Sequence, residues 1–332
     1  MPIRVLQVGL GPIGNAIVRQ CASRRRLKIV GAVDIDAAKV GRDLADVAEI
    51  DHKLNVKVAP EIVPAIRKAR PDIVVLCTSS SLEKVVPQIQ AILSCRVPTV
   101  STTEELAYPF YANRRLANRI NRMATRAKVA VLGTGVNPGF TMDALPITLS
   151  GACERVDKVL VERVQDASAR RLPFQQKIGA GLTEEQFQTR VDTGSVRHVG
   201  LTESVAMIAA AMGWKLDKIT DVIKPKVAAR PVKSPFLAVK KGQVAGIIQD
   251  GVGYRRGEPM ITLHMEAYLG APESYDAITI TGVPNLYSKI AGGVPGDIAT
   301  AAVTVNSIPK VIAAPPGLHT MRSLPIPSWF GD

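Results

Sequence analysis

The sequence predicts an α/β protein with a parallel-sheet domain followed by a second, α+β domain that carries a mixed or antiparallel sheet. Over residues 1–139, short continuous apolar runs alternate with helical patterns, as in parallel strands buried on both faces. Over residues 140–293 the strand patterns are longer and alternate between apolar and polar residues, which favours a sheet with one covered face. A final helix and tail, residues 294–332, are expected to return to the first domain.

The first strand pattern leads into a glycine-rich turn. After the apolar run Ile3–Val8, the chain follows a G-x-G-x-x-G pattern. The first glycine permits a tight turn, the second lets the backbone approach a pyrophosphate, and the third lets the next helix pack on the strand. The N-terminus of that helix then faces the phosphates. We therefore expect a Rossmann domain whose cofactor contacts include Gly9, Gly11, Pro12, Ile13 and Gly14.

A second apolar run, LKIVGAV, ends at Asp34, and 34 − 14 = 20 residues separate this carboxylate from the last glycine of the turn. At this spacing an acidic residue accepts hydrogen bonds from the adenine ribose. Asp34 would also repel a 2′-phosphate, so we expect NAD as the cofactor. NADP stays an alternative because Lys39 and Arg42 follow closely in the sequence.

The rest of the first domain alternates between helix and strand patterns. We expect helices at residues 37–49, 61–69, 82–93 and 108–127, and strands at 56–59, 72–80, 98–102 and 128–135. Ligands bind beyond the carboxyl ends of such strands. Hydroxyl residues that follow two of the strands are therefore predicted to contact the cofactor ribose and phosphates, with turn hydrogen bonding as the alternative. They are Thr78, Ser79, Ser80, Ser101 and Thr102.

The second domain is expected to begin with a helix at residues 141–150, after the sequence Asn137-Pro138-Gly139. Its predicted strands are 156–166, 243–254, 259–269 and 276–282, and further helices are expected near 183–190 and 200–212. A last helix is expected at 296–314.

Composition limits the class of protein. The chain has 332 residues, of which 46% are hydrophobic and 21% charged, as is typical of a soluble globular protein. No apolar stretch has the length of a membrane span and no signal-peptide pattern opens the chain, so we expect a cytoplasmic protein. The cysteines and histidines show neither the spacing of a metal site nor that of a disulfide framework.

The net charge of +13 raises the question of an anionic partner. Arg115, Arg119, Arg122 and Arg126 recur at helical spacing, and such a stripe can bind nucleic acid. Aromatic residues make up only 4% of the chain and are not interleaved with the stripe. We therefore expect no nucleic-acid partner and interpret the stripe as a solvated face that attracts an anionic cofactor or substrate.

Three segments resemble one protein family; they are Ser101–Pro109, Gly133–Phe140 and Gly296–Leu318. They are similar to the 2,4-diaminopentanoate dehydrogenases and the related native amine dehydrogenases, within the dihydrodipicolinate-reductase-like group. The resemblance covers nearly the whole chain. It implies an NAD(P)-dependent interconversion of an amine with a carbonyl compound and ammonia, and a homodimer formed largely through the second domain.

Two other groups of enzymes fit less well. Dihydrodipicolinate reductases carry a His-His…Lys pair and a Pro-Ser-Gly-Thr run in the second domain, and the comparable segment at residues 161–181, VERVQDASARRLPFQQKIGAG, lacks both. Homoserine dehydrogenases place a lysine just after the fifth strand, where this chain has Glu104. A cation is thus replaced by a carboxylate.

A carboxylate at that point suits amine chemistry. Reductive amination needs a base for the protons of ammonia and water, and a negative group beside the iminium that receives the hydride. Glu104 and Glu105 are the candidates, although acidic residues also favour a helix start through its dipole alone. Adjacent helical residues point about 100° apart, so one of the pair is expected to face the cleft. We favour Glu104, because it takes the place of the lysine of the homoserine enzymes.

Further site candidates lie at the turn near residue 137 and in later parts of the chain. Asn137 and Asn306 are expected to hold the cofactor carboxamide or to line the cleft, and helix capping is the alternative for Asn137. For the candidates for substrate contact, core packing is the alternative; they are Phe140, Met142, Phe174 and His264. A substrate carboxylate would meet cations that are otherwise surface or interface residues; these are Arg170, Arg171 and His198.

Together these features predict an NAD(P)-dependent amine dehydrogenase. It would catalyse the oxidative deamination of a primary amine and the reverse, reductive amination of an aldehyde or ketone with ammonia. One alternative is a reductase of a carbonyl or imine substrate without free ammonia. Another is a non-catalytic dinucleotide sensor, which would need no carboxylate beside the nicotinamide.

Overall fold

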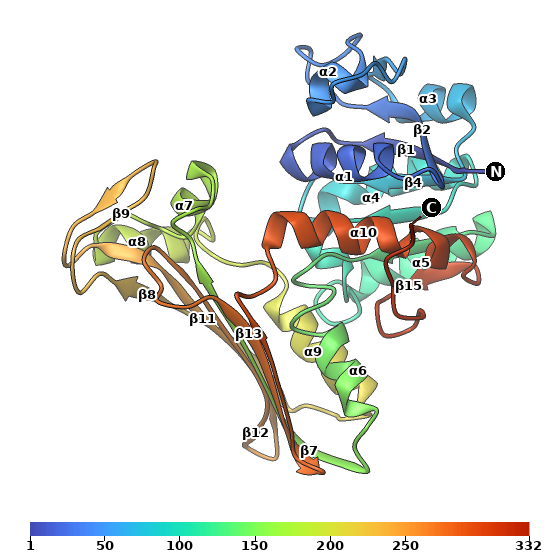
Figure 1. The fold of residues 1–332 in the computed structure, drawn as a ribbon. Helices are drawn as coiled ribbons and strands as arrows, with labels where there is room; N and C mark the ends of the chain where they lie inside the picture. The colour runs from blue at the N-terminus through green and yellow to red at the C-terminus, as the bar shows by residue number, and fades with distance from the viewer. Residues whose placement is uncertain (332) are drawn as a thin grey trace. The chain divides into compact units, whose positions relative to one another are not determined.

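The computed structural model describes residues 1–331, and the chain forms two compact units (Figure 1). The first unit contains Met1–Phe140 and the chain from Pro295 onward, and the second contains Thr141–Val294. Each unit has its own apolar core. The two units are described separately.

The first unit is built on a seven-stranded sheet in the order β15-β6-β5-β4-β1-β2-β3. All neighbouring strands are parallel, which confirms the predicted Rossmann sheet. The strands are β1 (Ile3–Val8), β2 (Leu27–Val33), β3 (Val58–Ala59), β4 (Ile73–Leu76), β5 (Thr99–Ser101), β6 (Ala130–Gly133) and β15 (Gly317–His319). The strand order reverses direction between β1 and β4, and ligands bind to such sheets at this switch point.

Helices pack on the sheet in two groups. α1 packs against α10, and α3, α4 and α5 share an apolar core with the strands (Figure 1). The helices are α1 (Pro12–Ala22), α2 (Leu44–Ala48), α3 (Ile62–Ala69), α4 (Leu82–Ser94), α5 (Arg114–Ala127) and α10 (Gly296–Ile312), with a short 3₁₀ helix, η1 (Glu104–Leu106).

Two predicted helices are shorter than expected. Of residues 37–49 only α2 is helical, because the Asp36 side chain accepts a hydrogen bond from the Ala38 backbone N–H and forms a turn instead. The Asp43 carboxylate then caps α2. α5 begins at Arg114 and not at residue 108, because turns occupy the chain between η1 and α5.

The second unit contains a six-stranded sheet in the order β14-β13-β7-β12-β11-β8. β7 and β12 are parallel and the other pairs are antiparallel, so the predicted mixed sheet is confirmed. The strands are β7 (Arg155–Asp166), β8 (Lys218–Val227), β11 (Val244–Arg255), β12 (Glu258–Tyr268), β13 (Tyr275–Val283) and β14 (Leu286–Ala291). β9 (Val232–Lys233) and β10 (Ala238–Val239) form a separate pair. The helices are α6 (Ala144–Ser150), α7 (Leu172–Lys177), α8 (Glu184–Asp192) and α9 (Leu201–Ala211).

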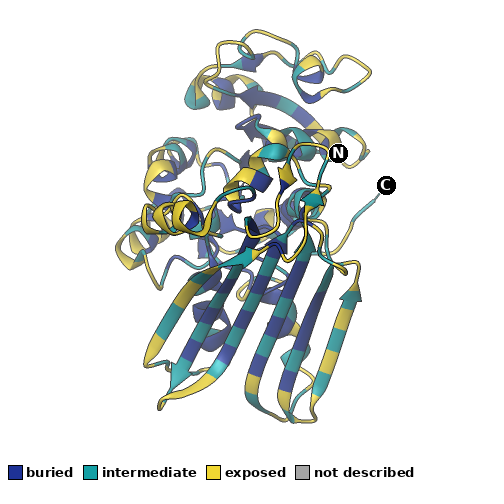
Figure 2. Cartoon of the chain, turned by 90° about the vertical axis from the view of Figure 1, so that its left-hand side faces the viewer, coloured by how far each residue is buried: buried dark blue, intermediate teal, exposed yellow. Residues whose placement is uncertain are grey.

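One face of this sheet carries the core of the second unit. Ile261 and Leu263 of β12 are fully buried there against residues of α9 such as Leu201 and Val205. The alternate residues of β12 are only partly buried and point to the other face. Figure 2 looks onto this open face, where buried and partly exposed residues alternate along the strands.

A buried ion pair joins β7 to β13. Arg163 and Asp276 are each 3% exposed and hydrogen-bonded to each other. Arg163 Nη2 also donates to the Val294 carbonyl at 2.8 Å, and the Val294 N–H donates to Asp276 Oδ2 at 2.7 Å. The pair therefore fixes the point at which the chain leaves the second unit.

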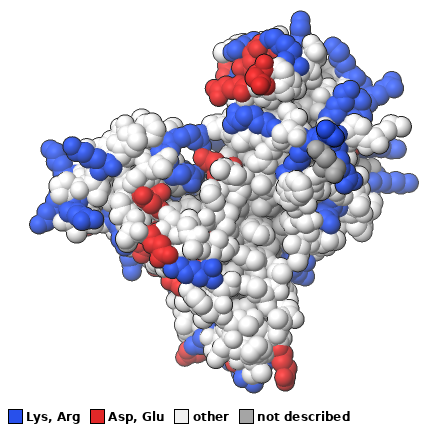
Figure 3. Space-filling model, in the orientation of Figure 1, with Lys and Arg blue, Asp and Glu red and all other residues white. Residues whose placement is uncertain are grey.

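The surface of the first unit is rich in cations. The predicted stripe of Arg115, Arg119, Arg122 and Arg126 is exposed on α5, and α5 contains no acidic residue. Figure 3 shows Lys and Arg side chains along the right-hand margin with few acidic ones among them. None of the helices in residues 1–331 is long and apolar enough to cross a membrane.

Candidate active site

The candidate site of the first unit lies at the carboxyl edge of the parallel sheet. The Gly9 backbone N–H donates to the Val33 carbonyl at 2.8 Å, and the Cys77 N–H donates to the Val8 carbonyl at 2.8 Å. These bonds bring the turns after β1, β2 and β4 side by side. The glycine turn therefore lies at the switch point of the strand order.

The three glycines of the turn differ in what surrounds them. Gly9 has a φ of +87°, and a Cβ added there would overlap the Cys77 carbonyl. A Cβ on Gly14 would overlap the Gly9 carbonyl. A Cβ on Gly11, whose φ is an ordinary −70°, would meet nothing within 4 Å. The fold thus requires Gly9 and Gly14, whereas Gly11 leaves space for something outside the chain.

That space fits a dinucleotide. α1 begins directly after Gly11, and no side chain caps its N-terminus. Backbone N–H groups and the positive end of the helix dipole at such a terminus favour a phosphate. The glycine turn would accordingly hold the pyrophosphate.

Gln7 supports the turn from within the sheet, a role that the sequence analysis does not predict. It is 1% exposed, and its Nε2 donates to the Gly9 carbonyl at 3.0 Å. The available signal was a polar residue between the apolar Leu6 and Val8, near the end of the run IRVLQV. A buried amide is retained where it satisfies backbone groups that the turn leaves unpaired.

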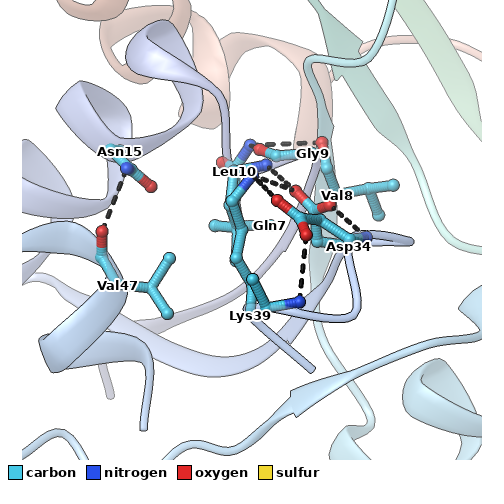
Figure 4. Close-up of polar contacts among 10 residues, drawn as sticks. Gln7, Val8, Gly9, Leu10, Asn15, Asp34, Lys39 and Val47 are labelled. Atoms are coloured by element: carbon cyan, nitrogen blue, oxygen red, sulfur yellow. Dashed lines mark hydrogen bonds and ion pairs between the residues drawn. The ribbon is translucent and has the colours of Figure 1, made fainter. Parts of the chain in front are cut away.

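Asp34 is fixed in place beside this turn (Figure 4). Its Oδ2 accepts a hydrogen bond from the Leu10 N–H at 2.7 Å, and its Oδ1 accepts one from the Asp36 N–H at 2.9 Å. Each carboxylate oxygen can accept a second bond, so Oδ1 retains capacity for a ribose hydroxyl. Lys39 Nζ lies 3.5 Å from Asp34 Oδ2.

The turn after β4 contains three of the predicted cofactor contacts. The Thr78 hydroxyl donates to Gln88 Oε1 at 2.7 Å, and Ser79 Oγ accepts from the Ser81 N–H at 3.1 Å. The Ser80 carbonyl accepts from the Glu105 N–H at 3.3 Å. Only the bond between Ser79 and Ser81 is a turn hydrogen bond. Thr78 also lies against Gly9.

The prediction for Ser101 needs correction. Its side chain is fully buried, and its hydroxyl lies 2.9 Å from both the Leu76 carbonyl and Thr103 Oγ1. It therefore joins β5 to β4 and offers no surface to a cofactor. Thr102, its neighbour, is partly exposed and remains a candidate.

Glu104 and Glu105 lie together in η1, but only one is engaged by the fold. Glu105 Oε2 accepts from the Leu82 N–H at 2.7 Å and so caps the first turn of α4. Within residues 1–331 the Glu104 carboxylate makes neither a hydrogen bond nor an ion pair. Both side chains are half-buried. Glu105 thus caps a helix, whereas the Glu104 carboxylate has no partner among the described residues.

The turn after β6 contains Asn137, which is buried. α10 supports this turn, since Thr300 Oγ1 lies 3.4 Å from the Val136 backbone N. Asn306, further along α10, accepts a hydrogen bond from Arg24 Nη1 at 2.7 Å. Arg24 follows the C-terminal end of α1, at the far end from the glycine turn. The prediction that Asn306 contacts the cofactor is corrected accordingly.

Among the substrate candidates, Phe140 is partly exposed at the end of the first unit. Met142 is fully buried in the core of the second unit, so it packs the core and does not line a site. Arg170 lies over the Phe174 ring, 4.2 Å from Cζ to the ring centroid. The Arg171 carbonyl accepts from the N–H groups of the following turn of α7.

His198 and His264 lie on opposite sides of the six-stranded sheet. His198 is bonded through its backbone to Gln249, which points into the core. His264 lies on the open face, with Nδ1 2.6 Å from Asp250 Oδ1 and Nε2 3.2 Å from Glu266 Oε1. The two histidine candidates therefore lie on different faces of this sheet.

The parallel sheet, the glycine turn at its switch point and Asp34 define a nicotinamide-dinucleotide-dependent oxidoreductase. Comparison with known proteins narrows this class. The model of the 2,4-diaminopentanoate dehydrogenase C-terminal domain matches residues 140–332. The chain is 37% identical to a 2,4-diaminopentanoate dehydrogenase of Acetoanaerobium sticklandii, over 98% of this chain and 94% of the relative. The chain therefore belongs to the 2,4-diaminopentanoate dehydrogenase family.

More distant relatives include two proteins named amine dehydrogenase. An amine dehydrogenase of Streptomyces virginiae is 22% identical over 96% of this chain and 95% of its own length. The structure of an amine dehydrogenase from Mycobacterium smegmatis matches with a TM-score of 0.87 and 24% identity, over 99% of this chain and 98% of the other. A dihydrodipicolinate reductase from Paenisporosarcina sp. TG-14 matches with a TM-score of 0.55 and 14% identity, over 96% and 98%. The two structural likenesses concern the fold.

Proposed function

We propose that the chain is an NAD(P)-dependent amine dehydrogenase, which interconverts a primary amine with an aldehyde or ketone and ammonia. The observation that carries this proposal is the difference between Glu104 and Glu105. The Glu105 carboxylate caps α4, whereas the Glu104 carboxylate stands at the carboxyl end of β5 with no hydrogen-bond partner in residues 1–331. A sensor that only binds a dinucleotide would not need an unpaired carboxylate there.

Glu104 supplies the acid–base chemistry. A bound dinucleotide would give or accept the hydride. The Glu104 carboxylate takes one proton from the ammonium ion that supplies ammonia and a second from the nitrogen once it has added to the carbonyl carbon. It passes both protons to the oxygen, which leaves as water. Its negative charge then stabilises the iminium. In the direction of deamination the same group deprotonates the water that attacks the iminium.

The proposal also covers the cofactor and the assembly. Asp34 and its two backbone donors support NAD as the preferred cofactor. The open face of the second unit supports a homodimer, because a partner would cover the apolar part of that face. We assign substrate recognition to residues of the second unit. We expect the protein to work in the cytoplasm.

The decisive experiment measures NADH consumption over a panel of aldehydes, ketones and keto acids, with and without ammonia. We expect turnover that requires ammonia and yields the amine, identified by mass spectrometry. Equal turnover without ammonia would make the protein a carbonyl reductase. Tight NADH binding with no turnover on any carbonyl compound or amine would favour the sensor.

A further inference from the structure

The loop after β2 carries a cation next to the predicted ribose site. Lys39 Nζ lies 3.5 Å from Asp34 Oδ2 and 3.2 Å from Asp36 Oδ2. Figure 4 shows the Lys39 side chain extended toward Asp34, on the same side as the glycine turn. The Lys39 ammonium is thus held at Asp34, the carboxylate that is expected to accept hydrogen bonds from the ribose.

The loop geometry places Lys39 there. The Asp36 Oδ1 accepts from the Ala38 N–H at 3.0 Å, and the Lys39 N–H donates to the Asp36 carbonyl at 2.9 Å. These two bonds close a turn that folds Lys39 back over Asp34. The side chain remains 27% exposed, so its ammonium can also reach a ligand.

We propose that Lys39 is the ligand of a 2′-phosphate and makes the site accept NADP as well as NAD, an inference that rests on the proposed dinucleotide-dependent function. Asp34 accepts the ribose hydroxyls of NAD, and Lys39 offsets the repulsion between Asp34 and the phosphate of NADP. An ammonium has three donors, and the two carboxylates use two of them. A phosphate carries a charge of about −1.5 to −2 at neutral pH, so it can compete with the two carboxylates for the Lys39 ammonium.

Arg42 is the other cation of this loop, and the structure gives it a different role. It is exposed and, within residues 1–331, forms no ion pair with Asp34 or Asp36. Its carbonyl accepts from the Val58 N–H at 3.0 Å, a main-chain bond that does not involve its guanidinium. Of the two cations, Lys39 is therefore the one held at Asp34.

The test uses fragments of the two cofactors that lack the nicotinamide ring and therefore cannot transfer a hydride. Binding of 2′,5′-ADP and of 5′-AMP to the full chain is measured by calorimetry, for the wild type and for Lys39→Gln. We expect Lys39→Gln to weaken 2′,5′-ADP about tenfold or more, as for the loss of a charge-assisted hydrogen bond, with a much smaller change for 5′-AMP. Lys39→Arg should restore 2′,5′-ADP binding. Lys28→Gln, which removes a charge at the other end of β2, is the matched control and should change neither.

Other results would overturn the proposal. If Lys39→Gln weakens both fragments equally, the lysine only shapes the loop. If Arg42→Gln and not Lys39→Gln weakens 2′,5′-ADP, the phosphate is held by Arg42. Neither fragment contains nicotinamide, so the result does not depend on amine chemistry. An enzyme that is active on amines but shows no effect of Lys39→Gln would refute this inference alone.

Discussion

At the scale of single residues, the sequence identified the two glutamates but could not choose between them on physical grounds. Their separation depends on a contact across the sheet edge, because the N–H of Leu82, which Glu105 caps, belongs to a different strand–helix unit. The prediction that Ser101 contacts the cofactor was wrong for the same reason, because its burial depends on contacts with Leu76 and Thr103. The glycine turn and Asp34 were predictable, because their requirements lie within one βαβ segment.

Glu104→Gln should stop the chemistry while cofactor binding survives. The substitution keeps the shape of the side chain but removes the base and the charge, and loss of a general base lowers kcat by about 10²–10⁴-fold. The NADH dissociation constant should change little, because the phosphates are held at the glycine turn. Glu105→Gln is the control and should retain most activity with a lower melting temperature. An inactive Glu105→Gln beside an active Glu104→Gln would reverse the assignment.

Two glycine substitutions should separate binding from folding. Gly14→Ala forces a Cβ into the Gly9 carbonyl and should cost about 1–3 kcal/mol of stability, as overpacking does. Gly11→Ala meets no protein atom within 4 Å, so it should leave the melting temperature unchanged and weaken NADH binding about tenfold or more. Thermal melts and NADH titration measure the two effects. A Gly11→Ala variant with unchanged NADH affinity would place the pyrophosphate elsewhere.

At the scale of helices and strands, the sequence predicted the central strands well but missed three of the four edge strands of the two large sheets, all except β3. β1 and β2 match the predicted runs, because strands buried on both faces are continuously apolar. β8 and β14 were missed, and they are the two edges of the six-stranded sheet. β8 has no continuous apolar run and contains Pro225, which an edge strand tolerates. β15, an edge of the parallel sheet, was missed as well.

His264 on β12 should make stability depend on pH. Burial disfavours its charged form, but hydrogen bonds to Asp250 and Glu266 outweigh this and hold its pKa above the ordinary value of 6.5. Lys226 on β8 pairs with Glu266, and Glu162 on β7 lies in register with His264. A raised pKa in the folded state stabilises the protein fully below pH 6.5, and this contribution is lost as the pH rises through the folded value.

The measurement is the difference in melting temperature between the wild type and His264→Gln at several pH values. It should be largest near pH 6 and shrink toward pH 9. His52→Gln, at an exposed histidine, should show little difference throughout. A difference for His264→Gln that grows with pH would mean that the imidazole is held neutral.

At the scale of the whole molecule, one face of the six-stranded sheet is left without a covering layer by the other elements of the second unit (Figure 2). Its partly buried apolar residues include Leu160, Ile248 and Val252, and Val222 of β8 is exposed. Four charged residues of the face are paired with each other: His264, Asp250, Glu266 and Lys226. A partner that covers this cluster would not bury an unpaired charge there, which would be costly.

We therefore expect the protein to be a dimer through this face. Light scattering at micromolar concentration should give twice the chain mass of 35.5 kDa. Val252→Glu adds an unpaired charge in the middle of the face and should produce a monomer that is still folded by circular dichroism, because Val252 lies on the side of β11 away from the core. Tyr111→Glu, at an exposed aromatic residue of the first unit, should leave the dimer intact. A monomeric wild type would refute the dimer, and a dimer that survives Val252→Glu would assign its interface to another surface.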